Sequence, residues 1–427
     1  MTRFLIATTV LALLLPTIEV GAADLSGTWQ ADGKPQRVLK IRKSPNGYSG
    51  DIYNLGVEQP LAPRHESVSR IAVSGKSVRF APDKAQGSFD GTLAEDGKSL
   101  VGTWKMLYGP ASQPVTFTHA ANKEEWVIDA SPHKATFIAV QPGVRLEVLD
   151  WGGSGPPLLF LPGMYSTAHA FDGFAEKFIS KHHVYAITRR GFGDSGLPAL
   201  NDENYDADRL GDDVIAVMNA LHMQKPVIAG HSSSGGELSS IGTRHPERVA
   251  GLIYLEALFS YSFDDPTIPD IAVDGATVRR NMGRLLDLQP STVQWRALIK
   301  ETQAAMVNLE QSLKDMYARG TFMEKPLDAQ SPSDYVANKI NINVRRYGVA
   351  PVPILAIVAL SKYCPPGCDN PDMQRIMTNA VLRADHFEKA APNARVVRIP
   401  GASHYIWRSN EAQVEQEMNT FMHGLSH

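Results

Sequence analysis

A serine set among small residues, directly after a short apolar run, is the clearest candidate for chemistry in this sequence. Residues 226–229 are apolar, residues 230–234 read Gly-His-Ser-Ser-Ser, and residues 235–244 have the pattern of a helix. A strand that ends in Gly-x-Ser and turns at once into a helix is typical of a nucleophile elbow, whose strained backbone lifts the serine hydroxyl above the edge of a sheet. We therefore predict that Ser232 is a nucleophile.

Two features of this turn bear on that prediction. Ser234 occupies the position where such elbows usually carry glycine, a mild departure because serine is also small. The alternative interpretation is a Ser/Gly-rich loop or a phosphate-binding turn. A phosphate-binding turn of the Walker type carries a lysine after its glycines, and no lysine follows Gly235 and Gly236 here.

The segments around this turn alternate between strand and helix patterns. This alternation predicts a doubly wound α/β fold with a mostly parallel sheet, over residues 134–427. A long stretch without strand pattern, about 259–342, predicts a helical cap inserted into this fold. We expect a first hairpin at 136–140 and 145–150, further strands at 157–161, 184–188, 249–255, 354–360 and 394–399, and helices at 206–221 and 411–422.

Residues 24–121 have a different texture, with short alternating runs separated by turn signals. Asn46-Gly47, Ser74-Gly75 and Asp96-Gly97 favour hairpins, and Gly27-Thr28-Trp29 is echoed by Gly102-Thr103-Trp104. We predict a small antiparallel β domain, a barrel or a sandwich, whose aromatic residues form a core. Its role is open between binding a substrate or cell wall and packing on the other domain.

The N-terminus and the cysteines indicate an oxidising destination. Residues 1–23 contain Arg3, an apolar run and then small residues, which is the pattern of a cleaved secretory signal peptide; an uncleaved anchor is the alternative. The two cysteines, Cys364 and Cys368, are close enough in sequence for a loop disulfide. We expect a secreted or periplasmic protein without a stable membrane anchor.

Composition narrows the partners. The formal net charge is −3 and no basic run occurs, so nothing favours nucleic acid as a partner. We expect a small-molecule substrate, no cofactor and no metal, whereas the oligomeric state is open.

Several motifs, in this order, resemble the α/β-hydrolase family, in the branch with a helical cap between the sixth and seventh strands. They are Leu-Pro-Gly-Met at 161–164, Arg-Gly-Phe-Gly-Asp-Ser-Gly at 190–196, the elbow at 230–236, His-Pro-Glu-Arg-Val at 245–249 and Gly-Ala-Ser-His at 401–404. The resemblance covers residues 134–427 and implies a serine hydrolase. Family members that attack epoxides or haloalkanes use an aspartate nucleophile, which argues against those substrates.

The resemblance also implies a base and an oxyanion hole. The order nucleophile, acid, histidine points to His404, on a turn after the last strand; His231, His245 and His386 are rivals by residue type alone. The two backbone donors expected for the oxyanion hole are the N–H groups of Ser233 and Met164.

Family members usually carry His-Gly before the second of these donors. Pro162 stands in place of that histidine, and Gly163 is kept. The replacement leaves the backbone donor and removes a side chain that often braces the loop. Arg189, Arg190 and Asp194, in and next to the motif at 190–196, are expected to stabilise the strand end.

The triad acid departs from the common family pattern. An aspartate is expected shortly after the seventh strand, but Lys362 occupies that place, and Asp369 and Asp372 lie beyond the cysteine loop. Glu256 closes an apolar strand, where a carboxylate is costly unless it is paired. We predict Glu256 as the acid, with the 369–372 loop as the alternative.

The expected activity is cleavage of a carboxylic ester through an acyl-enzyme. Amide, lactone or carbon–carbon bond hydrolysis and cofactor-free perhydrolysis could use the same triad. From a different class, a slow-turnover ligand-binding or receptor protein could retain it. The cap side chains expected to set specificity include Tyr261, Phe263, Trp295 and Met306.

Overall fold

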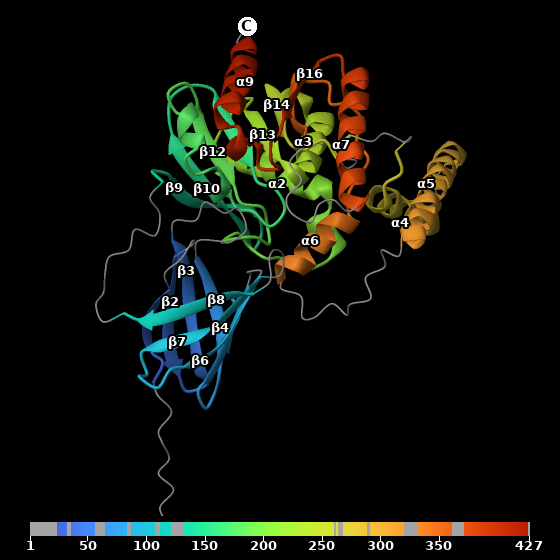
Figure 1. The fold of residues 1–427 in the computed structure, drawn as a ribbon. Coiled ribbons are helices and arrows are strands. Elements are labelled where there is room, and N and C mark those ends of the chain that lie inside the picture. Colours follow the sequence, from blue (N-terminus) through green and yellow to red (C-terminus); the bar gives the residue numbers. More distant parts are fainter. Residues whose placement is uncertain are drawn as a thin grey trace, which may run out of the picture.

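The chain folds into a small β-barrel followed by an α/β domain (Figure 1). The computed structural model describes residues 24–31, 36–55, 65–82, 87–106, 112–120, 131–259, 262–263, 268–287, 291–319, 332–360 and 371–425. Residues 1–23 and the loop that holds Cys364 and Cys368 lie outside the described residues, so signal peptide and disulfide stay predictions.

The N-terminal unit is a closed antiparallel barrel of eight strands, in which β1 pairs with both β2 and β8. The glycines of the three predicted turns, Gly47, Gly75 and Gly97, all have positive φ, a conformation that other residues rarely adopt. The strands are β1 Gly27–Ala31, β2 Gln36–Ser44, β3 Gly47–Leu55, β4 His65–Ser74, β5 Ser77–Phe80, β6 Gly87–Leu93, β7 Ser99–Met106 and β8 Gln113–His119.

Aromatic residues fill this barrel, as the sequence predicted. Phe80 stacks on Phe89 with ring centroids 5.2 Å apart, and Phe89 meets Phe117 edge to face. Trp29, from the first of the two repeated Gly-Thr-Trp motifs, is buried and donates its indole N–H to the carbonyl of Leu25. The described tryptophan and phenylalanine side chains of the barrel therefore form a core.

The α/β domain is built on an eight-stranded, mostly parallel sheet with the order β16-β15-β14-β13-β11-β12-β10-β9. The predicted first hairpin is antiparallel, β10 is antiparallel to β12, and the remaining pairs are parallel. The strands are β9 Lys134–Gln141, β10 Val144–Gly152, β11 Pro157–Leu161, β12 His183–Ile187, β13 Val227–His231, β14 Gly251–Leu255, β15 Ile354–Leu360 and β16 Ala394–Pro400.

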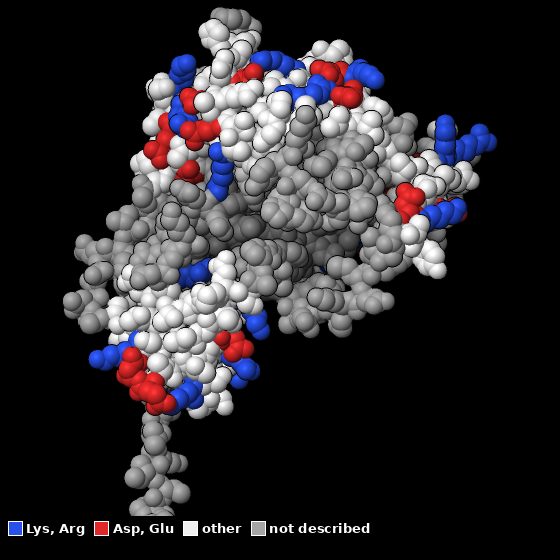
Figure 2. Space-filling view, viewed as in Figure 1, with Lys and Arg blue, Asp and Glu red and all other residues white. Residues whose placement is uncertain are grey.

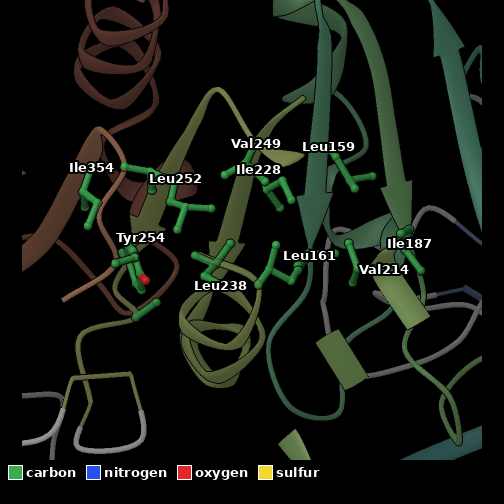
Figure 3. Packing of buried hydrophobic residues seen from close by; sticks show 14 of the residues in the cluster. Leu159, Leu161, Ile187, Val214, Ile228, Leu238, Val249, Leu252, Tyr254 and Ile354 are labelled. Carbon is green, nitrogen blue, oxygen red and sulfur yellow. The ribbon is translucent and has the colours of Figure 1, made fainter. Parts of the chain in front are cut away.

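Helices cover both faces of this sheet, which is why its central strands are almost entirely apolar. On one face, Ile228 and Leu252 pack with Leu238 of α3 (Figure 3). On the other face, Phe160 packs among residues of η1, η2, α8 and α9. These elements are η1 Ala168–Phe171, η2 Ala175–Phe178, α1 Asp202–Tyr205, α2 Ala207–Ala220, η3 Ser232–Ser234, α3 Gly235–Arg244, η4 Pro246–Arg248, α7 Pro371–Ala390, α8 Ile406–Ser409 and α9 Glu411–Gly424.

The segment between β14 and β15 contains three helices in its described parts, α4 Ile271–Asp287, α5 Thr292–Arg319 and α6 Pro332–Ile342. The helices α4 and α5 pack against each other. None of the helices in the described ranges is long and apolar enough to span a membrane. On the face seen in Figure 2, lysine and arginine side chains lie among aspartate and glutamate side chains, on the barrel as well as on the α/β domain.

Candidate active site

Ser232 lies at the sharp turn between β13 and α3, and its backbone is strained. Its φ is +52°, a left-handed conformation that is uncommon for residues other than glycine. The turn is possible because small residues surround it. A Cβ on Gly230 would lie 3.0 Å from the side chains of Leu238 and Ser234, and a Cβ on Gly163 would lie 3.1 Å from Cβ of Ser232.

His404 comes within hydrogen-bonding distance of Ser232 from a loop after β16. Its Nε2 lies 3.0 Å from Oγ of Ser232, although 172 residues separate the two in sequence. Parallel strands bring this about, because their carboxyl ends meet at one edge of the sheet. The imidazole is 43% exposed, so the pair can be reached from solvent.

Glu256 directly follows β14 and lies on the other side of the histidine. Its Oε2 is 3.4 Å from Nδ1 of His404, and its Oε1 accepts a hydrogen bond from the backbone N–H of Ala359 on β15. Glu256 also has a positive φ, of +49°. The alternative acid Asp369 lies outside the described residues, and the side chain of Asp372 is likewise not described.

The backbone groups predicted to form an oxyanion hole lie beside this pair. Ser233 follows the nucleophile in η3, and Met164 follows Gly163 after β11. A Cβ on Gly163 would lie only 2.7 Å from Nδ1 of His231, so only glycine allows the loop to approach the elbow this closely. The loop thus runs directly along the residues that flank the nucleophile.

His231 positions the loop of His404, a role that the sequence pattern did not reveal. It is buried, and burial lowers its pKa well below 6.5, so the ring is neutral. Its Nε2–H donates to the backbone carbonyl of His404 over 3.0 Å. The ring also packs edge to face on Trp407. The sequence offered one indication of this role, because His231 lies next to the predicted nucleophile and is not itself predicted to belong to the triad.

Two buried ion pairs stabilise the end of β12. Arg190 pairs with Asp213 of α2 over 2.5 Å and is fully buried. Arg189 pairs with Glu237 of α3, also over 2.5 Å. The sequence favoured a structural role for both arginines. The ion pairs agree with this, because they connect the residues after β12 to α2 and α3. Burying charges at these positions requires such partners.

A second group of titratable side chains could in principle hold a cation. One donor atom from each of His133, His169 and Asp172 lies within 4.8 Å of the others. Burial disfavours the charged form of His169, but hydrogen bonds to Asp172 and Glu147 outweigh it and raise its pKa to about 9. A metal ion would have to displace the proton of His169 in order to bind here. In this structure the side chains form a network of histidine–carboxylate contacts that also includes Glu147.

The predicted cap side chains occupy different environments. Phe263 packs against Phe387 of α7, with ring centroids 5.2 Å apart. Trp295 and Met306 lie on α5 and are exposed. Tyr261 lies outside the described residues.

Comparison with known proteins identifies the family. Residues 158–417 match the model of the Alpha/beta hydrolase family. The chain belongs to this family. Both the elbow and the histidine loop of this alpha/beta hydrolase fall inside the matched residues.

Individual relatives are distant. A non-heme chloroperoxidase of Streptomyces lividans is 32% identical over 136 residues, which cover 31% of this chain and 48% of that protein. A bifunctional esterase/perhydrolase of Acinetobacter calcoaceticus is 30% identical over 125 residues, covering 29% and 44%. The match to a solved thermophilic esterase from Thermogutta terrifontis covers 69% of this chain and 100% of that one, at 18% identity and a TM-score of 0.42. The chain spans less than half the length of the curated relatives it matches.

Proposed function

We propose that this alpha/beta hydrolase cleaves carboxylic esters through an acyl-enzyme formed on Ser232. The observation that carries the proposal is the series Ser232, His404, Glu256, with contacts of 3.0 Å and 3.4 Å, behind an elbow with positive φ. A nucleophile, a base and an orienting acid in this order are the requirements of acyl transfer.

The roles follow from the atoms in contact. Nε2 of His404 accepts the proton of Ser232 as Oγ attacks the ester carbonyl carbon. The tautomer this requires carries its hydrogen on Nδ1, which donates a hydrogen bond to Glu256, and the carboxylate stabilises the imidazolium that forms. The N–H groups of Ser233 and Met164 bind the developing oxyanion.

Acylation and deacylation each pass through a tetrahedral intermediate, and the first of these collapses to the acyl-enzyme. His404 returns the proton to the leaving alkoxide, so the alcohol departs and the acyl group stays on Oγ. Water attacks the acyl carbon while His404 takes one of its protons. The second tetrahedral intermediate collapses, the proton returns to Oγ, and a carboxylic acid is released.

Other reactions that use an acyl-enzyme are alternatives to ester hydrolysis. The names of two relatives, a non-heme chloroperoxidase and a bifunctional esterase/perhydrolase, include reactions other than ester hydrolysis. In perhydrolysis, hydrogen peroxide attacks the acyl-enzyme in place of water and a peracid is released. Amide, lactone and carbon–carbon bond substrates could also acylate the same serine. In a slow-turnover ligand-binding protein, acylation would be followed by negligible release.

A substrate series with an active-site label tests the proposal. The purified chain is treated with a fluorophosphonate and assayed on p-nitrophenyl esters of short and long acids, with and without hydrogen peroxide. Fast labelling with fast ester turnover is the expected result. Labelling with negligible turnover on every ester would favour the binding protein or another bond type, and peracid formation above the rate of hydrolysis would favour the perhydrolase.

We also propose that the chain is exported. The charged, apolar and small-residue pattern of residues 1–23 supports this, together with the closely spaced Cys364 and Cys368. An exported hydrolase would act on esters in the periplasm or outside the cell.

A further inference from the structure

A buried arginine contacts the loop that precedes Met164. Arg189 is the second residue after β12 and is 5% exposed. Its guanidinium donates through Nη2 to the carbonyl of Pro162 over 2.9 Å and through Nη1 to the carbonyl of Gly163 over 3.3 Å. Two consecutive peptide carbonyls of this loop are therefore bound to one planar, rigid group.

The second of these carbonyls fixes the direction of the Met164 N–H. The peptide bond between Gly163 and Met164 is planar, and in the trans form its C=O and N–H point in opposite directions. Because the carbonyl of Gly163 faces the guanidinium, the N–H of Met164 faces away from it. Gly163 lies against Ser232, so this orientation belongs to the peptide beside the nucleophile.

Two further residues hold the guanidinium in place. Glu237 of α3 accepts from Nε over 2.5 Å and from Nη2 over 3.1 Å, a two-point ion pair that fixes the plane of Arg189. Ser234 accepts from Nη2 over 2.9 Å and donates its own hydroxyl hydrogen to the carbonyl of Pro162 over 2.5 Å. The serine at the position usual for glycine thus supplies a hydroxyl that joins the elbow to the loop.

We propose that Arg189, oriented by Glu237 and assisted by Ser234, is a positioning residue that holds the Met164 N–H in place as an oxyanion donor. This inference rests on the proposed function. Pro162 replaces a histidine that often braces this loop in family members, and here Arg189 after β12 and Glu237 of α3 would brace the loop instead.

The physical benefit is preorganisation. A donor fixed before the reaction costs no reorganisation when the oxyanion forms, and the contribution of such donors appears in the transition state. Without Arg189, the carbonyl of Gly163 keeps, among the described residues, only the hydrogen bond from the backbone N–H of Ser166, also 3.3 Å long, so the peptide of Met164 can rotate more freely while substrate can still bind. The loss is therefore expected in kcat, and in the affinity of inhibitors that mimic the tetrahedral intermediate, with KM nearly unchanged.

The test compares Arg189→Lys and Ser234→Ala with Arg190→Lys. Lysine retains a charge for Glu237 but cannot bind it and two carbonyls at once. Arg190 is the matched control, because it is also buried and its hydrogen bonds in the described structure go to Asp213, Asn204 and Gln141 and not to the loop. Measured for each are the melting temperature, the rate at which a fluorophosphonate labels Ser232, kcat and KM on the best ester, and the inhibition constant of a boronic acid.

We expect Arg189→Lys to slow labelling and kcat by about 10- to 100-fold, somewhat less than the loss of an entire oxyanion donor, and to weaken boronic acid binding in proportion. Ser234→Ala should show the same pattern with a smaller loss, and it decides the matter if Arg189→Lys does not fold. In both variants KM should stay within about threefold of its value in the unmodified protein. Arg190→Lys should leave the labelling rate, kcat, KM and the inhibition constant of the boronic acid unchanged.

Equal rates in the folded variants and the control would overturn the inference, as would a loss confined to KM or one that spares the boronic acid. These outcomes would leave the proposed function intact. An unlabelled Ser232 in the unmodified protein would overturn the proposed function first, and this inference with it.

Discussion

At the scale of single residues, the site depends on two strained positions at neighbouring strand ends. Ser232 and Glu256 both adopt positive φ, +52° and +49°, directly after β13 and β14. Strain of this kind costs on the order of 1–3 kcal/mol per residue and persists where the surrounding structure imposes it. Here it turns a hydroxyl and a carboxylate toward one histidine.

Glu256→Gln tests the proposed acid. The amide retains the size of the side chain and an oxygen for the N–H of Ala359, but it cannot stabilise an imidazolium as a carboxylate does. Ester turnover should fall by about 10²- to 10⁴-fold while the melting temperature changes little. Asp369→Asn is the matched comparison and should be nearly silent. The reverse pair of results would transfer the acid to the 369–372 loop.

Which residues the sequence could identify depended on whether their contacts are set by strand order. Ser232 and Glu256 end apolar strands and His404 follows the last one, so the edge of a parallel sheet brings them together. The pairing of Arg189 with Glu237 depends on side-chain packing between β12 and α3, 48 positions apart, which no local pattern encodes. For this pair the sequence showed only that a charged residue lies next to each of two segments expected to be buried.

At the scale of elements, the start of α3 must approach the chain after β14 very closely. A Cβ on Gly235 would lie 2.0 Å from Oγ of Ser262 and 2.2 Å from the carbonyl oxygen of Ala257. The backbone oxygen cannot rotate away as a side chain could. The elbow helix is therefore positioned by a glycine contact as well as by its apolar face.

Gly235→Ala should displace α3 and with it the nucleophile. We expect a loss of about 1–3 kcal/mol in the free energy of unfolding, as for overpacked core sites, and a clear fall in turnover. Gly283→Ala in α4 is the control, because a Cβ there meets nothing within 4 Å. In a helix interior that change should be neutral or stabilising by up to about 1 kcal/mol. Chemical denaturation measures both, and equal effects would refute the packing argument.

The His169 cluster joins η1 to β10 and gives stability a pH dependence. The folded pKa of about 9 lies above the ordinary 6.5, so the contribution is complete below pH 6.5 and is lost as the pH rises through 9. His169→Gln should therefore lower the free energy of unfolding by on the order of 2–3 kcal/mol at pH 6 and remove much of its decline between pH 7 and 9. If the free energy of unfolding of His169→Gln declines as much between pH 7 and 9 as that of the unmodified protein, other titratable groups cause the decline.

At the scale of the whole molecule, the pattern of apolar residues and turns predicted the fold class, but it did not predict that the barrel is closed. Alternating runs and Gly-containing turns predicted β1 to β8, but barrel and sandwich differ in whether the first and last strands pair. Trp29 and Gln30 of β1 pair with His119 and Thr118 of β8, a contact between strands far apart in sequence. Hairpin signals report only neighbouring strands.

The export proposal is tested on the mature protein. Expressed in a secreting host, the chain should begin near Ala23 or Asp24, and its non-reduced mass should be 2 Da below that with free thiols at Cys364 and Cys368. Because the loop is short, reducing it should cost only modest stability. Two free thiols would refute the disulfide, and an intact N-terminus would refute cleavage.

The central claim, that Ser232 carries the acyl group, is tested most directly by mapping the labelled residue. The protein is treated with a fluorophosphonate, digested and analysed by mass spectrometry, beside Ser232→Ala, Ser233→Ala and Ser234→Ala. The adduct should lie on Ser232 alone, and Ser232→Ala should lose both the adduct and about four to six orders of magnitude in ester turnover. An adduct on Ser233 or Ser234, or a Ser232→Ala variant that keeps most of its activity, would contradict the account.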